Sequence, residues 1–204
     1  MLYLVTSPGE AAVRDLLDRH RVGLISQPGS NPASGGWIWA ADNGCFGSRW
    51  VEDRWARWLD RQPRAGCLFA VVPDVVADAD ATLERWDRYS SVVRDLRFPV
   101  AFVLQDGATI DTVPFSDADA VFVGGSTAWK ESESAYRLAA RARDLGLWVH
   151  VGRVNTRRRF RAWAGQADSA DGSILSFGPA TNVPRVEGWI TDLEQSPVFE
   201  LPGA

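Results

Sequence analysis

The chain has 204 residues, of which 46% are hydrophobic and 24% are charged, as is typical of one globular domain with a sizeable core. A formal net charge of −4 excludes a protein that binds polyanions through its overall charge, so contact with nucleic acid would need a local basic patch. Two cysteines, Cys45 and Cys67, are too few for a disulfide framework or a four-cysteine zinc site.

The N-terminal segment Met1–Thr6 is apolar, lacks a basic region and is broken by Pro8-Gly9. These features predict a strand and not a signal peptide. No stretch of the sequence approaches the ~20 apolar residues of a membrane span. We therefore expect a cytoplasmic protein that makes no contact with a membrane.

Eight short apolar runs rich in β-forming residues follow one another along the chain and are predicted to be strands. They are Leu2–Ser7, Val22–Ser26, Gly36–Asp42, Cys67–Asp74, Val100–Asp106, Ala120–Gly125, Trp148–Val154 and Ser169–Leu175. Five amphipathic stretches between them predict helices that cover a sheet. These are Glu10–His20, Trp50–Gln62, Ala79–Leu96, Glu133–Leu145 and Thr156–Gly165.

This alternation predicts an α/β fold, a compact (β/α)8 TIM-like barrel that forms a single domain over residues 1–204, with 197–204 as a loose tail. Continuous apolar runs such as Leu68–Val72 are typical of parallel strands buried on both faces. The Gly-, Pro- and Ser-rich segment Gln27–Gly35 is expected to be a loop. An open doubly wound sheet is the structural alternative, and the number of strands favours closure.

Polar residues gather where the predicted strands end, which in a barrel is the catalytic face. They are Asp42, Asp74, Gln105-Asp106, Gly124-Gly125, His150 with Arg153 and Asn155, and Asp168 with Asp171. Each has a purely structural alternative. An aspartate after a strand often caps a helix or forms a turn, a histidine inside a strand is often a packed core residue, and the run Arg157-Arg158-Arg159 often forms a solvated helix face.

Several of these motifs, taken in order, resemble those of tRNA-guanine transglycosylases. They are Asp42-Asn43-Gly44-Cys45-Phe46-Gly47, Pro73-Asp74, Val103-Leu104-Gln105-Asp106-Gly107, Val123-Gly124-Gly125 and Asp168-Ser169-Ala170-Asp171. The chain is most similar to the short, phage-associated DNA 7-deazaguanine transglycosylase group, which would place it in the host cytoplasm if a phage encodes it. The zinc-binding cysteine motif of the tRNA enzymes is absent, and the resemblance implies neither a metal nor a cofactor.

The resemblance implies a pentosyltransferase that replaces guanine in nucleic acid, DNA more than tRNA, with a 7-deazaguanine base through a covalent aspartyl-glycosyl intermediate. Asp171 would be the nucleophile and Asp42 the general acid and base. The base would contact the side chains or backbone of Asp74, Gln105, Gly124, Gly125 and Phe46. Flanking phosphates would contact Lys130, Arg153, Asn155, Arg157, Arg158, Arg159 and Arg185.

Three alternatives stay open at this point, one of them a phosphate-binding barrel enzyme that uses Gly124-Gly125 and Gly152. The same carboxylates would serve an N-glycosylase or nucleoside hydrolase that uses water as acceptor, or the barrel could bind nucleotides or nucleic acid without catalysis. The expected partners are nucleic acid, a free 7-deazapurine or guanine base, and an accessory protein that opens a duplex.

Overall fold

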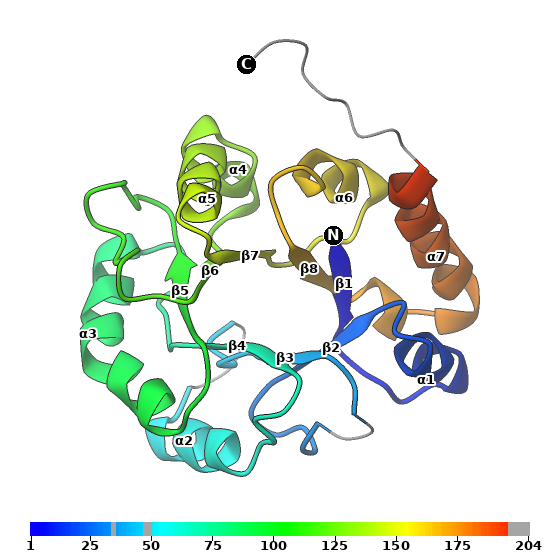
Figure 1. Ribbon diagram of the computed structural model, residues 1–204, viewed down its shortest axis with the longest axis horizontal. Helices are drawn as coiled ribbons and strands as arrows, with labels where there is room; N and C mark the ends of the chain where they lie inside the picture. The colour runs from blue at the N-terminus through cyan, green and yellow to red at the C-terminus, as the bar shows by residue number, and fades with distance from the viewer. Residues whose placement is uncertain (34–35, 47–49, 196–204) are drawn as a thin grey trace.

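Eight parallel strands close into a barrel in the computed structural model, which describes residues 1–33, 36–46 and 50–195. The strands are β1 (Leu2–Val5), β2 (Gly23–Ser26), β3 (Trp39–Ala41), β4 (Cys67–Val71), β5 (Val100–Leu104), β6 (Ala120–Val123), β7 (Trp148–Val151) and β8 (Ser169–Gly172). Each strand pairs with its neighbour in the sequence, and β8 pairs with β1, which closes the ring (Figure 1). The predicted (β/α)8 barrel is confirmed, and the open-sheet alternative is excluded.

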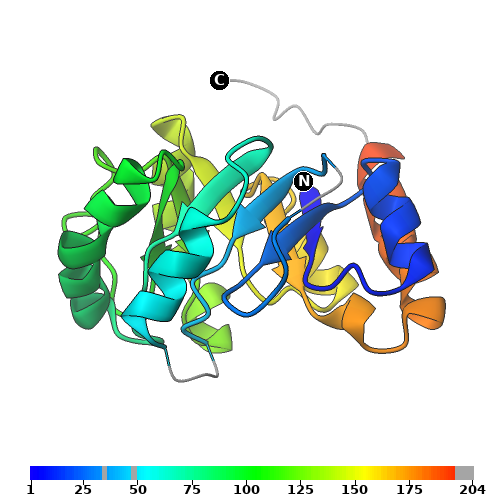
Figure 2. The same ribbon diagram turned by 90° about the horizontal axis from the view of Figure 1, so that it is seen from below.

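Helices surround the ring of strands. They are α1 (Ala11–Asp18), α2 (Glu52–Asp60), α3 (Ala79–Asp95), α4 (Thr127–Lys130), α5 (Glu133–Asp144), α6 (Arg157–Trp163) and α7 (Pro179–Gln195), with a 3-10 turn at Ile174–Ser176. From the side, α3 lies at one flank of the barrel, and α1 with α7 lies at the other (Figure 2). Among the described residues, the connections from β2 to β3 and from β5 to β6 contain no helix.

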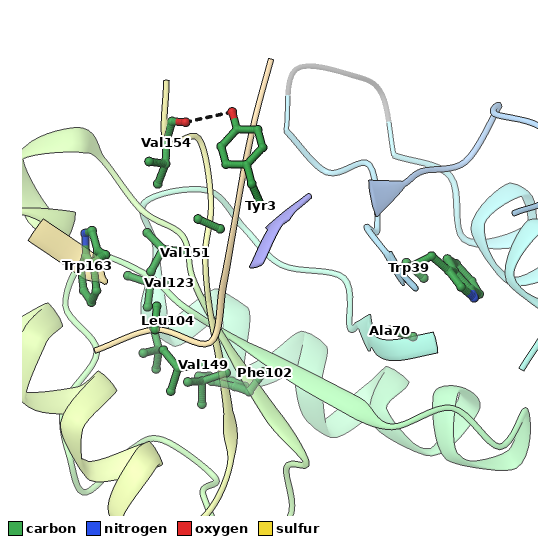
Figure 3. Packing of buried hydrophobic residues seen from close by; sticks show 14 of the residues in the cluster. Tyr3, Trp39, Ala70, Phe102, Leu104, Val123, Val149, Val151, Val154 and Trp163 are labelled. Atoms are coloured by element: carbon green, nitrogen blue, oxygen red, sulfur yellow. Dashed lines mark hydrogen bonds between the residues drawn. The ribbon is translucent and has the colours of Figure 1, made fainter. Parts of the chain in front are cut away.

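Side chains of each strand alternate between the barrel interior and the layer beneath the helices, as expected for a pleated strand. Leu4, Phe69, Val71 and Val103 belong to the inner cluster. The buried residues next to these four in each strand, such as Tyr3, belong to the larger outer cluster. Figure 3 shows part of this outer layer, where the Tyr3 hydroxyl donates a hydrogen bond to the Val154 carbonyl at 3.1 Å.

Two aspartates fix strand pairs at the end of the barrel where the strands begin. Asp119 precedes β6, and its carboxylate accepts a hydrogen bond from the backbone N–H of Val100 at 2.8 Å. Asp168 precedes β8 and accepts from the backbone N–H of Val149 at the same distance. The expectation that Asp168 lies with the polar residues at the end where the strands finish is therefore wrong, since it lies at the opposite end.

The long helix α7 is not among the helices that the sequence predicts. Pro184 and Gly188 within it obscure the helical pattern, although Pro179 occupies the first helical position, where proline is well tolerated. Its buried face consists mainly of Val183, Val186, Trp189 and Ile190. The loose tail predicted at 197–204 lies outside the described residues. No helix in the described ranges is long and apolar enough to cross a membrane.

Candidate active site

A cavity of about 420 Å³ opens at the end of the barrel where the strands finish. Its wall contains both predicted catalytic aspartates and every predicted base-binding residue, together with two of the predicted phosphate contacts. These residues are Asp42, Asp171, Asp74, Gln105, Gly124, Gly125, Phe46, Arg153 and Asn155. Besides Phe46, the apolar part of the wall comes from Val71, Val76, Val103 and Phe122. A cavity of this size accommodates a small organic molecule.

Asp42 follows the outward-facing Ala41 at the end of β3, so the alternation of the strand turns its carboxyl into the barrel. The backbone N–H of Gly44 donates to the Asp42 carboxylate at 3.2 Å and forms an Asx turn. Burial raises the pKa of Asp42 to about 7, and the negative charges of Asp171 and Asp74 act in the same direction. A carboxyl group with this pKa can hold a proton near neutral pH and can also release it.

Asp171 comes from β8, which β1 and β2 separate from β3 in the ring, and it points inward between the outward-facing Ala170 and Gly172. Its Oδ1 accepts hydrogen bonds from His150 Nε2 at 3.0 Å and from the backbone N–H of Arg153 at 3.2 Å. These two N–H groups fix the orientation of the Asp171 carboxyl, whereas Asp42 is held by the backbone N–H of Gly44. Asp42 and Asp171 therefore face one cavity in two different environments.

Asp74 forms the centre of a buried polar network on the β4 side of the cavity. Asn43 donates from its side-chain amide to Asp74 Oδ1 at 2.7 Å, and Gln105 donates to Oδ2. The other end of the Gln105 amide accepts from the backbone N–H of Ala77 at 2.8 Å, which fixes its orientation. Burial raises the pKa of Asp74, while the two amide donors oppose this shift.

The glycines at the end of β6 are required by close packing. A Cβ atom on Gly124 would lie 2.9 Å from the Gln105 amide nitrogen and 2.8 Å from Val103. Gly125 has a φ of +71°, and a Cβ there would lie 2.6 Å from an Asp106 carboxylate oxygen. Asp106 itself binds the N–H and hydroxyl of Ser126, so it supports the loop after β6 instead of lining the cavity.

Two loops meet at the mouth of the cavity. The guanidinium of Arg153 lies over the Phe46 ring, 4.3 Å from its centre, and also donates a hydrogen bond to the Gly125 carbonyl. Arg153 adopts a φ of +61°, in the left-handed region that non-glycine residues rarely occupy. This backbone conformation accompanies the hydrogen bond from its N–H to Asp171. Gly47, the last residue of the predicted motif around Phe46, lies outside the described residues.

The remaining predicted phosphate contacts do not line this cavity. Arg157 pairs with Asp192 on α7, and Arg158 and Arg159 both pair with Glu131. Arg185 donates to the Asn182 side chain at 3.2 Å. The arginine run therefore joins neighbouring helices through ion pairs at the surface.

Lys130 is buried, and its ammonium donates to the Gly152 carbonyl at 2.6 Å. Burial lowers the pKa of this lysine to about 8, and the positive charge of Arg153 contributes in the same direction. Its ammonium is thus engaged inside the protein, behind the loop that carries Arg153.

Sequence reasoning missed several polar residues of the site. Thr6, Gln27 and Ser173 line the cavity, and Asn43 positions Asp74. All of them had a positional signal, because each lies at or just after the end of a strand, where polar residues also serve turns. In the three described ranges of the chain, no group of at least three His, Cys, Asp or Glu residues is arranged to hold a metal ion.

No protein-family model and no curated protein sequence matches the chain. Solved structures do share its fold. Tryptophan synthase from M. tuberculosis in a ligand-free form superposes with a TM-score of 0.55 at 18% identity, covering 94% of this chain and 89% of that one. KGPDC from Streptococcus mutans gives a TM-score of 0.55 at 10% identity over 94% and 95%. Tryptophan synthase subunit alpha from Legionella pneumophila gives 0.51 at 11% over 94% and 86%.

These findings correct the family expected from the sequence. The matched structures are tryptophan synthases and KGPDC, not tRNA-guanine or DNA 7-deazaguanine transglycosylases, so that resemblance is wrong. The activity expected with that family, base exchange in nucleic acid, is therefore also wrong. The same holds for the expected partners, which were DNA or tRNA, a free guanine or 7-deazapurine base, and an accessory protein. The physical reason is that short motifs rich in Asp, Asn and Gly recur at strand ends because turns and caps need them, as Asp106 illustrates. Pentosyl transfer stays a prediction without support from these comparisons.

Proposed function

We propose that this chain is an enzyme that carries out general acid–base chemistry on a small molecule bound in the cavity at the barrel mouth. The observation that carries the proposal is that Asp42 and Asp171, 129 positions apart in the sequence, line one cavity in unlike environments. Known (β/α)8 enzymes place their active sites at this end of the barrel. The matched structures support the fold alone, so the chemistry is argued from the cavity.

Asp42 is the group suited to donate a proton. Its pKa of about 7 means that a substantial fraction of the carboxyl is protonated at neutral pH, and the acid needs little energy to release the proton. Asp171 is placed to accept one, since two N–H groups orient its Oδ1 and, among the described residues, its Oδ2 accepts no hydrogen bond. Two acids with distinct environments can take opposite roles in one reaction.

A proton balance follows from these roles. Asp171 would remove a proton from a C–H, N–H or O–H group of the substrate, and Asp42 would give a proton to the atom that receives the electron pair of the breaking bond. The net result is an isomerisation or a cleavage without oxidation or reduction. After product release, a proton passes from Asp171 to Asp42 or is exchanged with solvent, which restores the starting state.

The wall of the cavity indicates the class of substrate. Asp74 and Asp171 present acceptors, while the apolar residues Val103 and Phe122 provide a surface for a flat or compact carbon skeleton. Arg153 provides a cation at the mouth, next to the exposed ring of Phe46. We therefore expect a polar small molecule that carries N–H or O–H donors toward the barrel and a carbonyl or acidic group toward Arg153.

The test is to incubate the purified protein with a defined mixture of polar metabolites and to follow loss and gain of masses. We expect wild-type protein to convert at least one compound, and Asp42→Asn and Asp171→Asn to lower its rate by about 100-fold or more. Asp95→Asn, at an exposed position of α3, is the matched control and should retain the wild-type rate. Wild-type rates in both cavity variants, with the fold confirmed by circular dichroism, would contradict the proposal.

A further inference from the structure

Four side chains form a continuous hydrogen-bonded chain inside the barrel and end at Asp171. The indole N–H of Trp148 donates to the Ser169 hydroxyl at 2.8 Å. The same hydroxyl lies 2.8 Å from His150 Nδ1, and His150 Nε2 lies 3.0 Å from Asp171 Oδ1. The register of β7 and β8 places His150 directly beside Ser169, so adjacent strands build the chain.

His150 has no exposed surface. Its ring is flanked by the rings of Phe69 and Phe122, whose centres lie 5.1 and 4.6 Å away. The strands packed against it bring one ionisable group within hydrogen-bonding distance, the carboxyl of Asp171. Burying a polar ring is costly unless both of its nitrogens are hydrogen-bonded, and Ser169 and Asp171 supply a partner at each.

The hydrogen-bond chain determines the tautomer of His150. The carboxylate of Asp171 can only accept, so His150 Nε2 must carry the proton of that bond. If the imidazole is neutral, its Nδ1 is then an acceptor and Ser169 must donate to it. Ser169 can do so because the Trp148 N–H, which is a donor only, binds a lone pair of the hydroxyl and leaves its proton available.

We propose that His150 is a positioning residue for Asp171, held as the neutral Nε2–H tautomer by Ser169 and Trp148. The inference rests on the proposed function, in which Asp171 is the base. His150 and the Arg153 backbone N–H both bind Oδ1. Within the described part of the chain, Oδ2 accepts no hydrogen bond, which leaves this oxygen to take the proton of the substrate. The ring of His150 fixes the carboxylate plane and its direction without touching the substrate.

The first experiment reads the tautomer and needs no substrate. The chain has two histidines, so a spectrum of 15N-histidine protein that correlates ring nitrogens with ring carbon-bound protons holds two sets of signals. His20→Gln removes the signals of the exposed His20 and assigns the others. We expect His150 at pH 7 to show a protonated Nε2 and an unprotonated Nδ1. A protonated Nδ1, or protons on both nitrogens, would overturn the proposal.

The second experiment uses a matched pair of substitutions. In His150→Gln the amide nitrogen occupies the position of Nε2 and can still donate to Asp171. In His150→Asn the amide nitrogen occupies the position of Nδ1 and reaches Ser169 instead. If His150 positions Asp171, the Gln variant should keep kcat within about 5-fold of wild type, while the Asn variant should lose about 10- to 100-fold in kcat with little change in KM.

Equal kcat losses in the Gln and Asn variants would overturn the positioning role and favour simple core packing. Because either variant could unfold, each is compared by thermal melting, and Ser169→Ala provides a third test. Ser169→Ala removes the donor to Nδ1, so the His150 signals should change to a mixture of tautomers. An unchanged single tautomer in this variant would contradict the role of Ser169. If no turnover is found in wild-type protein, the proposed function fails, while the tautomer result still decides this inference.

Discussion

The ammonium of Lys130 donates a hydrogen bond to the carbonyl of Gly152 at 2.6 Å, which connects α4 to the loop that follows β7. That loop carries Arg153, whose backbone N–H binds Asp171. The single lysine of the chain thus supports the wall of the cavity from behind.

Lys130 should titrate well below an ordinary lysine. Burial lowers its pKa to about 8 from the usual 10.5, and because no other lysine is present, 13C labelling at Cε gives one signal. The midpoint of its chemical-shift titration should be about 8, and a midpoint near 10.5 would contradict burial of the ammonium. Since the unfolded chain binds more protons than the folded one between pH 8 and 10.5, the lysine also makes the free energy of unfolding rise over that window.

Asp42 should make the protein less stable as the pH rises. Its folded pKa of about 7 exceeds the ordinary 3.8, so the folded state holds the proton that the unfolded state has released between these values. Asp42→Asn lacks this dependence. We expect the free energy of unfolding of Asp42→Asn, relative to wild type, to increase by about 2 to 3 kcal/mol from pH 5 to pH 8 in urea titrations. A constant difference across this range would show that Asp42 is not shifted.

Gly172 should not tolerate a side chain. A Cβ at this position would lie 2.4 Å from both the Tyr3 hydroxyl and the Asn155 side-chain oxygen. We expect Gly172→Ala to lower the free energy of unfolding by about 2 to 3 kcal/mol. Gly188→Ala is the control, because a Cβ there would meet no neighbouring side chain within 4 Å and the position is an exposed helical one, where alanine should add about 0.5 to 1 kcal/mol. Similar effects of the two substitutions in urea unfolding would contradict the packing argument.

The contribution of Gln105 to the free energy of unfolding should be largest when Asp74 is ionised. Gln105→Leu removes the donor to Asp74 and leaves the backbone N–H of Ala77 without its acceptor, so we expect a loss of about 2 to 4 kcal/mol of stability. The Gln105 bond lowers the pKa of Asp74, and without it that pKa should rise further. The loss measured by urea unfolding should therefore be larger at pH 8 than at pH 5. A loss that is independent of pH would mean that the amide supports only Ala77.

The sequence is sufficient to predict the eight strands, because each is a compact apolar run and each observed strand lies within its predicted range. It also predicts part of the cavity wall, since the position of Asp42 directly after a strand determines that its carboxyl points into the barrel. It does not predict α7, where Pro184 and Gly188 weaken a helical pattern that tertiary packing of Trp189 and Ile190 restores.

The sequence does not indicate which charged residues form ion pairs with one another. Arg157 and Asp192 are 35 positions apart, and nothing local indicates that α6 and α7 bring them together. A histidine inside a strand is more typical of a core residue, and the link from His150 to Asp171 is visible only from the register of β7 with β8. Identifying the family failed because turn and cap residues at strand ends serve the fold as well as any chemistry.

The aspartates that precede β6 and β8 have a practical consequence for anyone who wishes to redesign this protein. Asp119 and Asp168 lock the alignment of two strand pairs from the end remote from the cavity. Changes to residues around the opening leave these two contacts in place, because neither aspartate lies there. The scaffold thus keeps two contacts that set strand alignment apart from the opening, where positions without packing constraints are the ones to vary.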